Sequence, residues 1–183
     1  HISGNLGPRL ATMVDPLCGP ATVSIGVIRG GKQINIVPDP CSIQVDRRII
    51  PGEEPERVLR EIEKEFQEAF SSQGISWSID ELLLDWALNT PHQNPLVLTS
   101  RQIAANLGLP DGIYGETYGT NASKLQGIKN IPTIVYGPGS IAQAHSSEEW
   151  VSVEEVKQAS QFYLQLAQAY HKDFPTGVAE SSI

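Results

Sequence analysis

The chain has few cysteines, no long apolar run and no excess of basic residues, and each shortage excludes a class of protein. Two cysteines among 183 residues cannot form a disulfide framework, so we expect Cys18 and Cys41 to be free, buried thiols. No apolar run approaches the roughly 20 residues of a membrane span. The net charge of −8, without a basic stripe, argues against binding nucleic acid. We therefore expect neither membrane nor nucleic acid as a partner.

The start of the chain also lacks two common features. It opens on His1-Ile-Ser-Gly-Asn, without an initiator methionine and without the apolar core of a signal peptide. We interpret this start as a point partway through a longer gene product, which we expect to be cytoplasmic. Hydrophobic residues make up 40% of the chain, enough for one good core or two small ones.

The first ninety residues predict an α+β arrangement, a partial antiparallel sheet with helices on one face. Residues 1–20 are rich in glycine and proline, which predicts a loop with one short helical turn at 10–14. Val58, Ile62 and Phe66 recur at helical spacing and predict a helix over 54–71. Alternating apolar residues predict strands, with a tight turn at Gly30-Gly31 after the first. The predicted strands are 22–28, 33–37, 41–50 and 75–88.

The remaining residues predict the carboxyl-terminal part of a layered α/β domain. Residues 90–95, Thr-Pro-His-Gln-Asn-Pro, have the composition of a linker, so we expect one domain over 1–90 and a second over 91–183. Helices are predicted at 99–107, at 121–126 and from 153 onward, where Ser152 and Glu155 have the spacing of a capping box. The apolar run 131–136 predicts a buried strand.

The loop after that strand holds His145, the residue best placed for chemistry. Folds of the α/β class place their sites at the carboxyl ends of strands, and a neutral imidazole is a natural zinc ligand. The flanking Gly137-Pro-Gly139 leaves backbone amides that can hold an anion or a carbonyl oxygen. An isolated histidine is more often a surface or structural residue, so His145 alone does not define a metal site.

Three blocks of sequence together carry a resemblance to a known family. The first comprises Gly26-Val-Ile-Arg-Gly-Gly31, Ile34-Asn-Ile-Val-Pro38 and Val45-Asp-Arg-Arg-Ile-Ile-Pro-Gly52. The second is Tyr118-Gly-Thr-Asn-Ala122, and the third is Gly137-Pro-Gly-Ser-Ile-Ala-Gln-Ala-His145. In this order the blocks resemble the M20 metallopeptidase family, in which the first block lies in a lid, or dimerisation, domain, and the other two lie in a zinc-hydrolase domain. Acetylornithine deacetylase, succinyl-diaminopimelate desuccinylase, aminoacylase and glutamate carboxypeptidase belong to this family.

The resemblance implies a role for five residues. His145 matches a histidine that binds one of two zinc ions, for which cobalt can substitute. Asn35 and Arg48 match lid residues that reach the carboxylate or amide of a substrate in the partner subunit's site. A guanidinium suits a carboxylate because it can donate two parallel hydrogen bonds. Gly119 and Thr120 match a backbone segment that lines the substrate pocket.

Each of the substrate-binding assignments has a plainer alternative. Asn35 satisfies a turn, Arg48 pairs on the surface with Asp46 or Glu53, and Gly119 only permits a tight bend. Arg47 competes with Arg48, because alternation along a strand places the two side chains on opposite faces. The sequence leaves these alternatives open.

The chain departs from the family pattern in two ways. Asn121 stands where the family usually has an aspartate, which is not a metal ligand but changes the hydrogen bonds behind the site. The His-x-Asp motif, the bridging aspartate and the Glu-Glu pair of the family are all missing, and the first glutamate of that pair is the general base. Asp80, Glu81 and Asp85 lie on a predicted lid strand, remote from His145. We therefore expect no catalytic residue in this chain and no activity from it alone.

These observations give one leading hypothesis and one rival. The leading hypothesis is the carboxyl-terminal portion of a zinc-dependent hydrolase that cleaves an amide bond of N-acyl amino acids or peptide-like substrates. Its partners would be that small-molecule substrate and a second copy of the chain, bound through the lid domain. The rival is a non-catalytic dimerisation or binding module derived from the same family.

Overall fold

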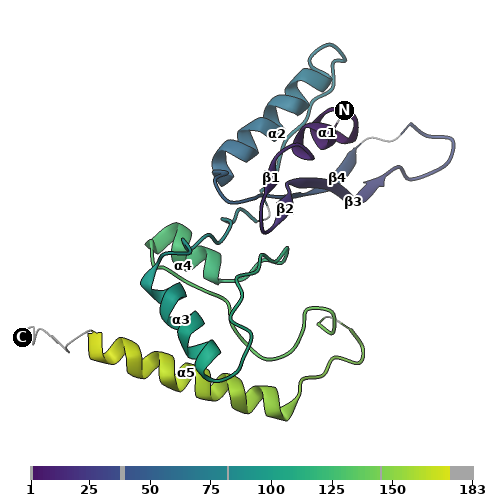
Figure 1. Cartoon of the computed structure of the whole chain (residues 1–183). Helices are drawn as coiled ribbons and strands as arrows, with labels where there is room; N and C mark the ends of the chain where they lie inside the picture. The colour runs from purple at the N-terminus through teal and green to yellow at the C-terminus, as the bar shows by residue number, and fades with distance from the viewer. Residues whose placement is uncertain (1, 38–39, 82, 145, 174–183) are drawn as a thin grey trace, which may run out of the picture. The chain divides into compact units, whose positions relative to one another are not determined.

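The computed structural model describes residues 2–37, 40–81, 83–144 and 146–173, and the chain forms two compact units (Figure 1). Unit 1 comprises His1–Asn89 and Tyr114–Lys129, and unit 2 comprises Thr90–Ile113 and Asn130–Ile183. The segment 114–129 thus returns to the unit formed by the first 89 residues. The assignment of residues 1–90 to a lid and of 91–183 to a catalytic domain stays a prediction.

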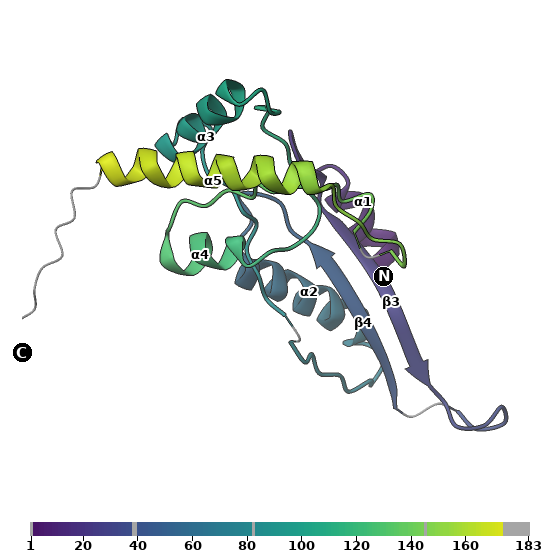
Figure 2. The same ribbon diagram turned by 90° about the horizontal axis from the view of Figure 1, so that it is seen from below.

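Unit 1 contains a long β-hairpin, which extends away from the helices (Figure 2). Strands β3 (Thr22–Gly30) and β4 (Cys41–Arg48) pair antiparallel, with Thr22 opposite Arg48 and Gly30 opposite Cys41. The register shifts between Ile25 and Val27, so the intervening residue forms a bulge. A smaller sheet pairs β1 (Val14–Asp15) with β2 (Gly19–Pro20). The strands predicted at 22–28 and 41–50 are confirmed.

Helix α2 (Pro55–Phe70) supplies the apolar stripe that covers this hairpin. Pro55 occupies the first turn, where a missing N–H costs nothing, and Glu56 complements the positive end of the helix dipole. Ile62 and Phe66 pack against the core cluster of unit 1, as Val23 of β3 and Val45 of β4 also do. The predicted helix over 54–71 is confirmed, and so is the antiparallel sheet with helices on one face.

Residues 2–10 are more helical than the sequence indicated. A π-helical turn, η1 (Ile2–Leu6), continues into α1 (Gly7–Leu10), whereas the predicted helical turn lay at 10–14. Leu6 and Leu10 are each only 1% exposed and form the unit 1 core together with Ala21 and Ile50. The glycine and proline content predicted a loop, but the segment is helical, and two leucines four residues apart anchor it in the core.

Unit 2 is built on two helices that pack together, α3 (Pro95–Asn106) and α5 (Val153–Asp173). Asn94 caps α3, because its side-chain oxygen accepts a hydrogen bond of 2.9 Å from the N–H of Leu96. Helix α3 therefore begins four residues before the predicted start at 99, inside the segment that the sequence indicated as a linker. Helix α4 (Ala122–Lys129) of unit 1 and helix α5 confirm the other two predicted helices.

The carboxyl end of α3 is closed by Gly108, whose φ of 69° lies in the left-handed region. The N–H of Gly108 donates to the carbonyl of Ala105 (3.0 Å), and that of Leu109 donates to Ala104 (2.9 Å). This is the Schellman pattern, which satisfies carbonyls that the helix leaves free. Leu109 is thereby turned onto the core of unit 2, which it helps to cover.

Three predicted strands are absent from the described residues. Residues 33–37 form an exposed turn, in which the N–H of Ile36 donates to the carbonyl of Gln33 (3.3 Å), so the hairpin connection is 31–40 and not a tight turn at Gly30-Gly31. Within 75–88 and 131–136, no described residue pairs with another strand. Apolar alternation marks a segment that suits a sheet, but the ladder also requires a partner.

Both cysteines are free thiols, as predicted, although Cys41 is exposed rather than buried. Cys18 is half-buried. Its burial and the nearby charge of Asp15 raise the pKa of the Cys18 thiol, which therefore stays protonated at neutral pH. No helix among the described residues is both long enough and apolar enough to cross a membrane.

The core of unit 2 makes a direct stability prediction. Phe162 of α5 is 0% exposed, and its ring stacks on that of Tyr136 with 3.8 Å between the centroids. We expect Phe162→Ala to lower the free energy of unfolding by about 3–5 kcal/mol, because it leaves a cavity and removes the ring contact. The matched control is Leu164→Ala on the same helix, since Leu164 is 59% exposed. If urea denaturation showed the same loss in the free energy of unfolding for both variants, this packing would be contradicted.

Candidate functional site

Two neighbouring arginines at the end of β4 have different surroundings. The side chain of Arg47 is only 6% exposed and forms an ion pair with Glu53, which is 9% exposed. Glu53 also accepts a hydrogen bond of 2.8 Å from the N–H of Ile50. Arg47 therefore holds the chain where β4 leads into α2. The opposite face carries Arg48, as alternation along the strand requires.

Arg48 is exposed, and two groups of unit 1 surround its guanidinium. Its side chain is 56% exposed, and its Nε donates to Asp46 Oδ2 at 2.8 Å. Its Nη1 lies 3.5 Å from the carbonyl oxygen of Thr117. The surface pairing with Asp46 that the sequence left open is therefore present. More than half of the Arg48 side chain still stays exposed, beside the segment that contains Gly119.

Asn35 lies in the exposed connection between the two strands. Figure 2 shows this connection extending beyond the strand ends. The flanking Ile34 and Val37 are 108% and 85% exposed. Arg48, in contrast, is opposite Thr22 at the base of the hairpin. Since β4 has 8 residues and a strand rises about 3.3 Å per residue, its two ends are separated by roughly 23 Å. Unit 1 thus does not bring Asn35 and Arg48 together.

Gly119 and Thr120 lead directly into α4. The Oγ1 of Thr120 accepts a hydrogen bond of 3.1 Å from the N–H of Ala122, and the Thr120 carbonyl accepts from Ser123. Asn121 is exposed, and its carbonyl accepts hydrogen bonds from the N–H groups of Lys124 and Leu125 in the first turn of the helix. The segment 117–120 is therefore the short approach to a helix, held at Thr120 and bordered by Arg48 at Thr117.

His145 lies outside the described residues, so its role stays a prediction. Before it, Gly139 has a φ of 88°, and its N–H donates a hydrogen bond of 2.9 Å to Glu155 Oε2 at the start of α5. This contact occupies one of the amides that the sequence offered to an anion. Among the described residues, no group of three or more His, Cys, Asp or Glu side chains is arranged to hold a metal ion.

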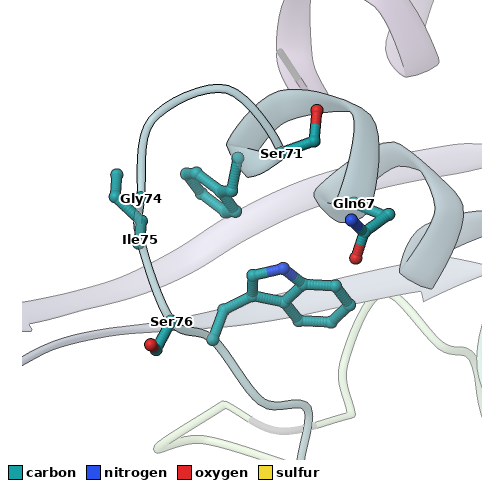
Figure 3. A pocket seen from close by; sticks show the side chains of 7 residues that line it. Gln67, Ser71, Gly74, Ile75 and Ser76 are labelled. Atoms are coloured by element: carbon teal, nitrogen blue, oxygen red, sulfur yellow. The ribbon is translucent and has the colours of Figure 1, made fainter.

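A hollow of about 460 Å³ lies at the carboxyl end of α2 (Figure 3). Trp77 and Phe70 line it, and the ring of Phe66 contacts those of both, with centroid distances of 5.6 Å and 5.8 Å. The side chains of Gln67, Ser71 and Ser76 make its surface largely polar. None of the predicted site residues lines it.

One polar contact joins two residues to which the sequence assigned no role in the site. The Oγ of Ser123 lies 2.8 Å from Asp85 Oδ1, across 38 residues of chain, and Ser123 is only 4% exposed. No local pattern marks this pair, since serine at the start of a helix and aspartate before tryptophan are both common. The only hint was the position of Ser123, just after the Tyr118–Ala122 block.

The arginine pair gives the second prediction. Arg47→Ala leaves Glu53 buried without its cation, so we expect a loss of about 3 kcal/mol in the free energy of unfolding. Arg48→Ala removes an exposed ion pair and should change that free energy by less than about 1 kcal/mol. Urea denaturation of the two variants measures both values. A larger loss for Arg48→Ala than for Arg47→Ala would reverse the two assignments.

Comparison with known proteins places the first unit in a known family. Residues 10–73 match the model of the peptidase dimerisation domain. Over 136 residues, 74% of this chain, the sequence is 32% identical to an acetylornithine deacetylase from Myxococcus xanthus, of which the match covers 34%. It is 27% identical over 161 residues, 78% of this chain, to a probable succinyl-diaminopimelate desuccinylase from Staphylococcus aureus, with 37% of that protein covered.

Solved structures agree on the fold. The chain is similar to the aminopeptidase PepT from Bacillus cereus, with a TM-score of 0.67 and 21% identity, over 87% of this chain and 43% of that one. A tripeptidase from Staphylococcus aureus is similar at a TM-score of 0.63 and 20% identity, over 87% and 42% of the two chains. The chain spans about a third of the length of the curated relatives it matches.

Proposed function

This chain belongs to the M20 peptidase family, and on that premise we propose that it is part of a zinc-dependent hydrolase that cleaves an amide bond of an N-acyl amino acid or a peptide-like substrate. The observation that carries the proposal is the agreement between the matched relatives and the dimerisation domain over 10–73. The relatives are named for removing an acetyl or succinyl group or a terminal amino acid, and each of these reactions breaks an amide bond.

The described residues do not provide the donors that a zinc pair needs. We therefore assign this chain a single metal ligand, His145, and assign the other ligands and the general base to the regions of these enzymes that the chain does not match. Bound zinc would polarise the carbonyl of the substrate and activate water. The residues described here would bind and orient the substrate.

Arg48 is the residue of unit 1 best suited to a substrate carboxylate. It is exposed, and its planar guanidinium can make two charge-assisted hydrogen bonds to one carboxylate. Asp46 already holds Nε at 2.8 Å and the carbonyl of Thr117 lies 3.5 Å from Nη1, so these contacts orient the group and leave Nη2 without a contact to either of them. The adjacent backbone of residues 117–120 would form the wall beside that carboxylate.

Asn35 cannot contact the same small substrate as Arg48 of its own chain. The strands separate the two residues by roughly 23 Å, which is longer than an N-acyl amino acid. We therefore assign Asn35 and Arg48 of one chain to two different active sites of a homodimer. The dimerisation domain supports this arrangement, because an exposed hairpin tip can reach a site of the partner only when two chains associate.

Zinc-dependent hydrolysis tests this proposal most simply. In the longest natural polypeptide that contains these residues, we expect hydrolysis of an N-acetyl amino acid or a dipeptide to disappear on chelation and to return with zinc. His145→Ala should lower both the bound zinc and the rate, whereas His92→Ala, an exposed histidine of the segment before α3, should leave both unchanged. Full activity and full zinc content of the His145→Ala protein would remove His145 from the site.

A non-catalytic dimerisation module is the second candidate. It is favoured by the fact that the matched family model is that of the dimerisation domain alone. The gene distinguishes the two candidates, since the enzyme requires a His-x-Asp motif upstream of these residues. A natural product without that motif, dimeric in sedimentation and inactive with zinc, would establish the module.

A further inference from the structure

Asp85 connects two segments of unit 1 that are distant in sequence. Its Oδ1 lies 2.8 Å from Ser123 Oγ and accepts a hydrogen bond of 2.9 Å from the N–H of Trp86. Its Oδ2 lies 3.8 Å from Lys124 Nζ, and the side chain is only 25% exposed. One carboxylate therefore contacts two consecutive residues in the first turn of α4.

Ser123 also contacts Thr120, which belongs to the segment that precedes the helix. Its buried hydroxyl lies 2.8 Å from Asp85 and also 2.8 Å from the carbonyl oxygen of Thr120. A hydroxyl has one proton to donate, and the charged carboxylate is the stronger acceptor. Asp85 thus sets the direction of the hydroxyl and fixes Ser123, whose N–H in turn donates to Thr120 (3.3 Å).

Two further contacts hold the segment 85–89 against α4. A methyl group at Gly127 would come within 2.4 Å of Trp86 Cγ, so the helix backbone and the indole approach as closely as only a glycine permits. The N–H of Asn89 donates to Gln126 Oε1 at 2.6 Å. Asp85 therefore acts from a segment that is itself fastened to the helix.

The glycine at 119 is not explained by the described residues around it. Its φ lies outside the left-handed region, and a methyl group there would meet no atom within 4 Å. A tight bend, the plainer alternative, is thus not what requires a glycine. Glycine also serves where a ligand approaches the backbone closely, which agrees with a segment that lines a substrate pocket.

We infer that Asp85 is a positioning residue: its carboxylate, acting through Ser123, fixes the conformation of Gly119–Thr120 against which the substrate binds. The inference rests on the proposed function for the substrate, but the link from Asp85 to this segment rests on the contacts alone. Arg48, whose Nη1 lies 3.5 Å from the carbonyl of Thr117, borders the other end of the segment. A displaced segment would therefore also change the wall beside that guanidinium.

Hydrogen exchange in the full-length protein tests the link to the segment without any substrate. We expect Asp85→Asn and Ser123→Ala each to speed amide exchange at residues 119–123 by about tenfold or more, because each removes a charge-assisted hydrogen bond. The double variant should exchange little faster than either single variant, since both substitutions break the same contact between Asp85 and Ser123. Asp80→Asn, an exposed carboxylate in the same stretch of chain, is the matched control.

Steady-state kinetics test the consequence for the substrate. For Asp85→Asn we expect KM to rise about tenfold, with kcat changed less than about threefold, because binding is weakened and the reacting groups remain. A residue needed only for stability would instead lower kcat in proportion to the folded fraction and leave KM unchanged. That result would overturn the inference, as would unchanged exchange at 119–123 or faster exchange throughout unit 1.

The two measurements separate failure of the inference from failure of the proposed function. If the wild-type protein, loaded with zinc, hydrolyses neither N-acetyl amino acids nor dipeptides, the proposed function is wrong. The positioning of residues 119–123 by Asp85 is then decided by hydrogen exchange alone. Activity in the wild type with no change of KM in Asp85→Asn would leave the proposed function intact and refute the role of Asp85.

Discussion

The antiparallel ladder between β3 and β4 is the constraint on which the functional interpretation depends. Because Thr22 is opposite Arg48 and Gly30 is opposite Cys41, the two ends of the hairpin are fixed at the full length of the strands. Val23 and Val45 also pack against the core cluster of unit 1, which anchors the base of the hairpin. One end presents a guanidinium and the other an amide, and no rotamer change can bring them together.

The same unit holds the base of the hairpin beside a segment that is distant in sequence. Residues 114–129 return to unit 1, where Arg48 reaches Thr117 and Asp85 reaches Ser123. The arginine and the segment 117–120 are thus assembled by contacts within one unit. Under the proposed function, this assembled surface is where the carboxylate of a substrate would bind.

The sequence predicted well those elements that follow from the spacing of their own apolar residues. It predicted poorly those that depend on pairing with a distant segment. Helix α2 followed from a stripe of apolar residues, and the two strands of the hairpin followed from alternation, although their connection did not. The segment 131–136 has the apolar pattern of a buried strand, yet it pairs with no described residue, because a pattern cannot supply its partner. The start of α3 was missed because Asn94-Pro95, an N-cap followed by a first-turn proline, has the composition of a linker. Asp85–Ser123 could not be predicted, since only the fold brings residues 38 positions apart into contact.

Subunit complementation tests the central claim, that Asn35 and Arg48 of one chain serve two different active sites. Full-length Asn35→Ala and Arg48→Ala proteins, each nearly inactive, are mixed under conditions in which subunits exchange. A mixed dimer then contains one site with both residues intact, so random exchange should restore about a quarter of the wild-type activity, as expected for isologous association. If the two residues served the same site, every site in the mixture would lack one of them. Activity that stays at the level of the single variants, with subunit exchange demonstrated, would contradict the account.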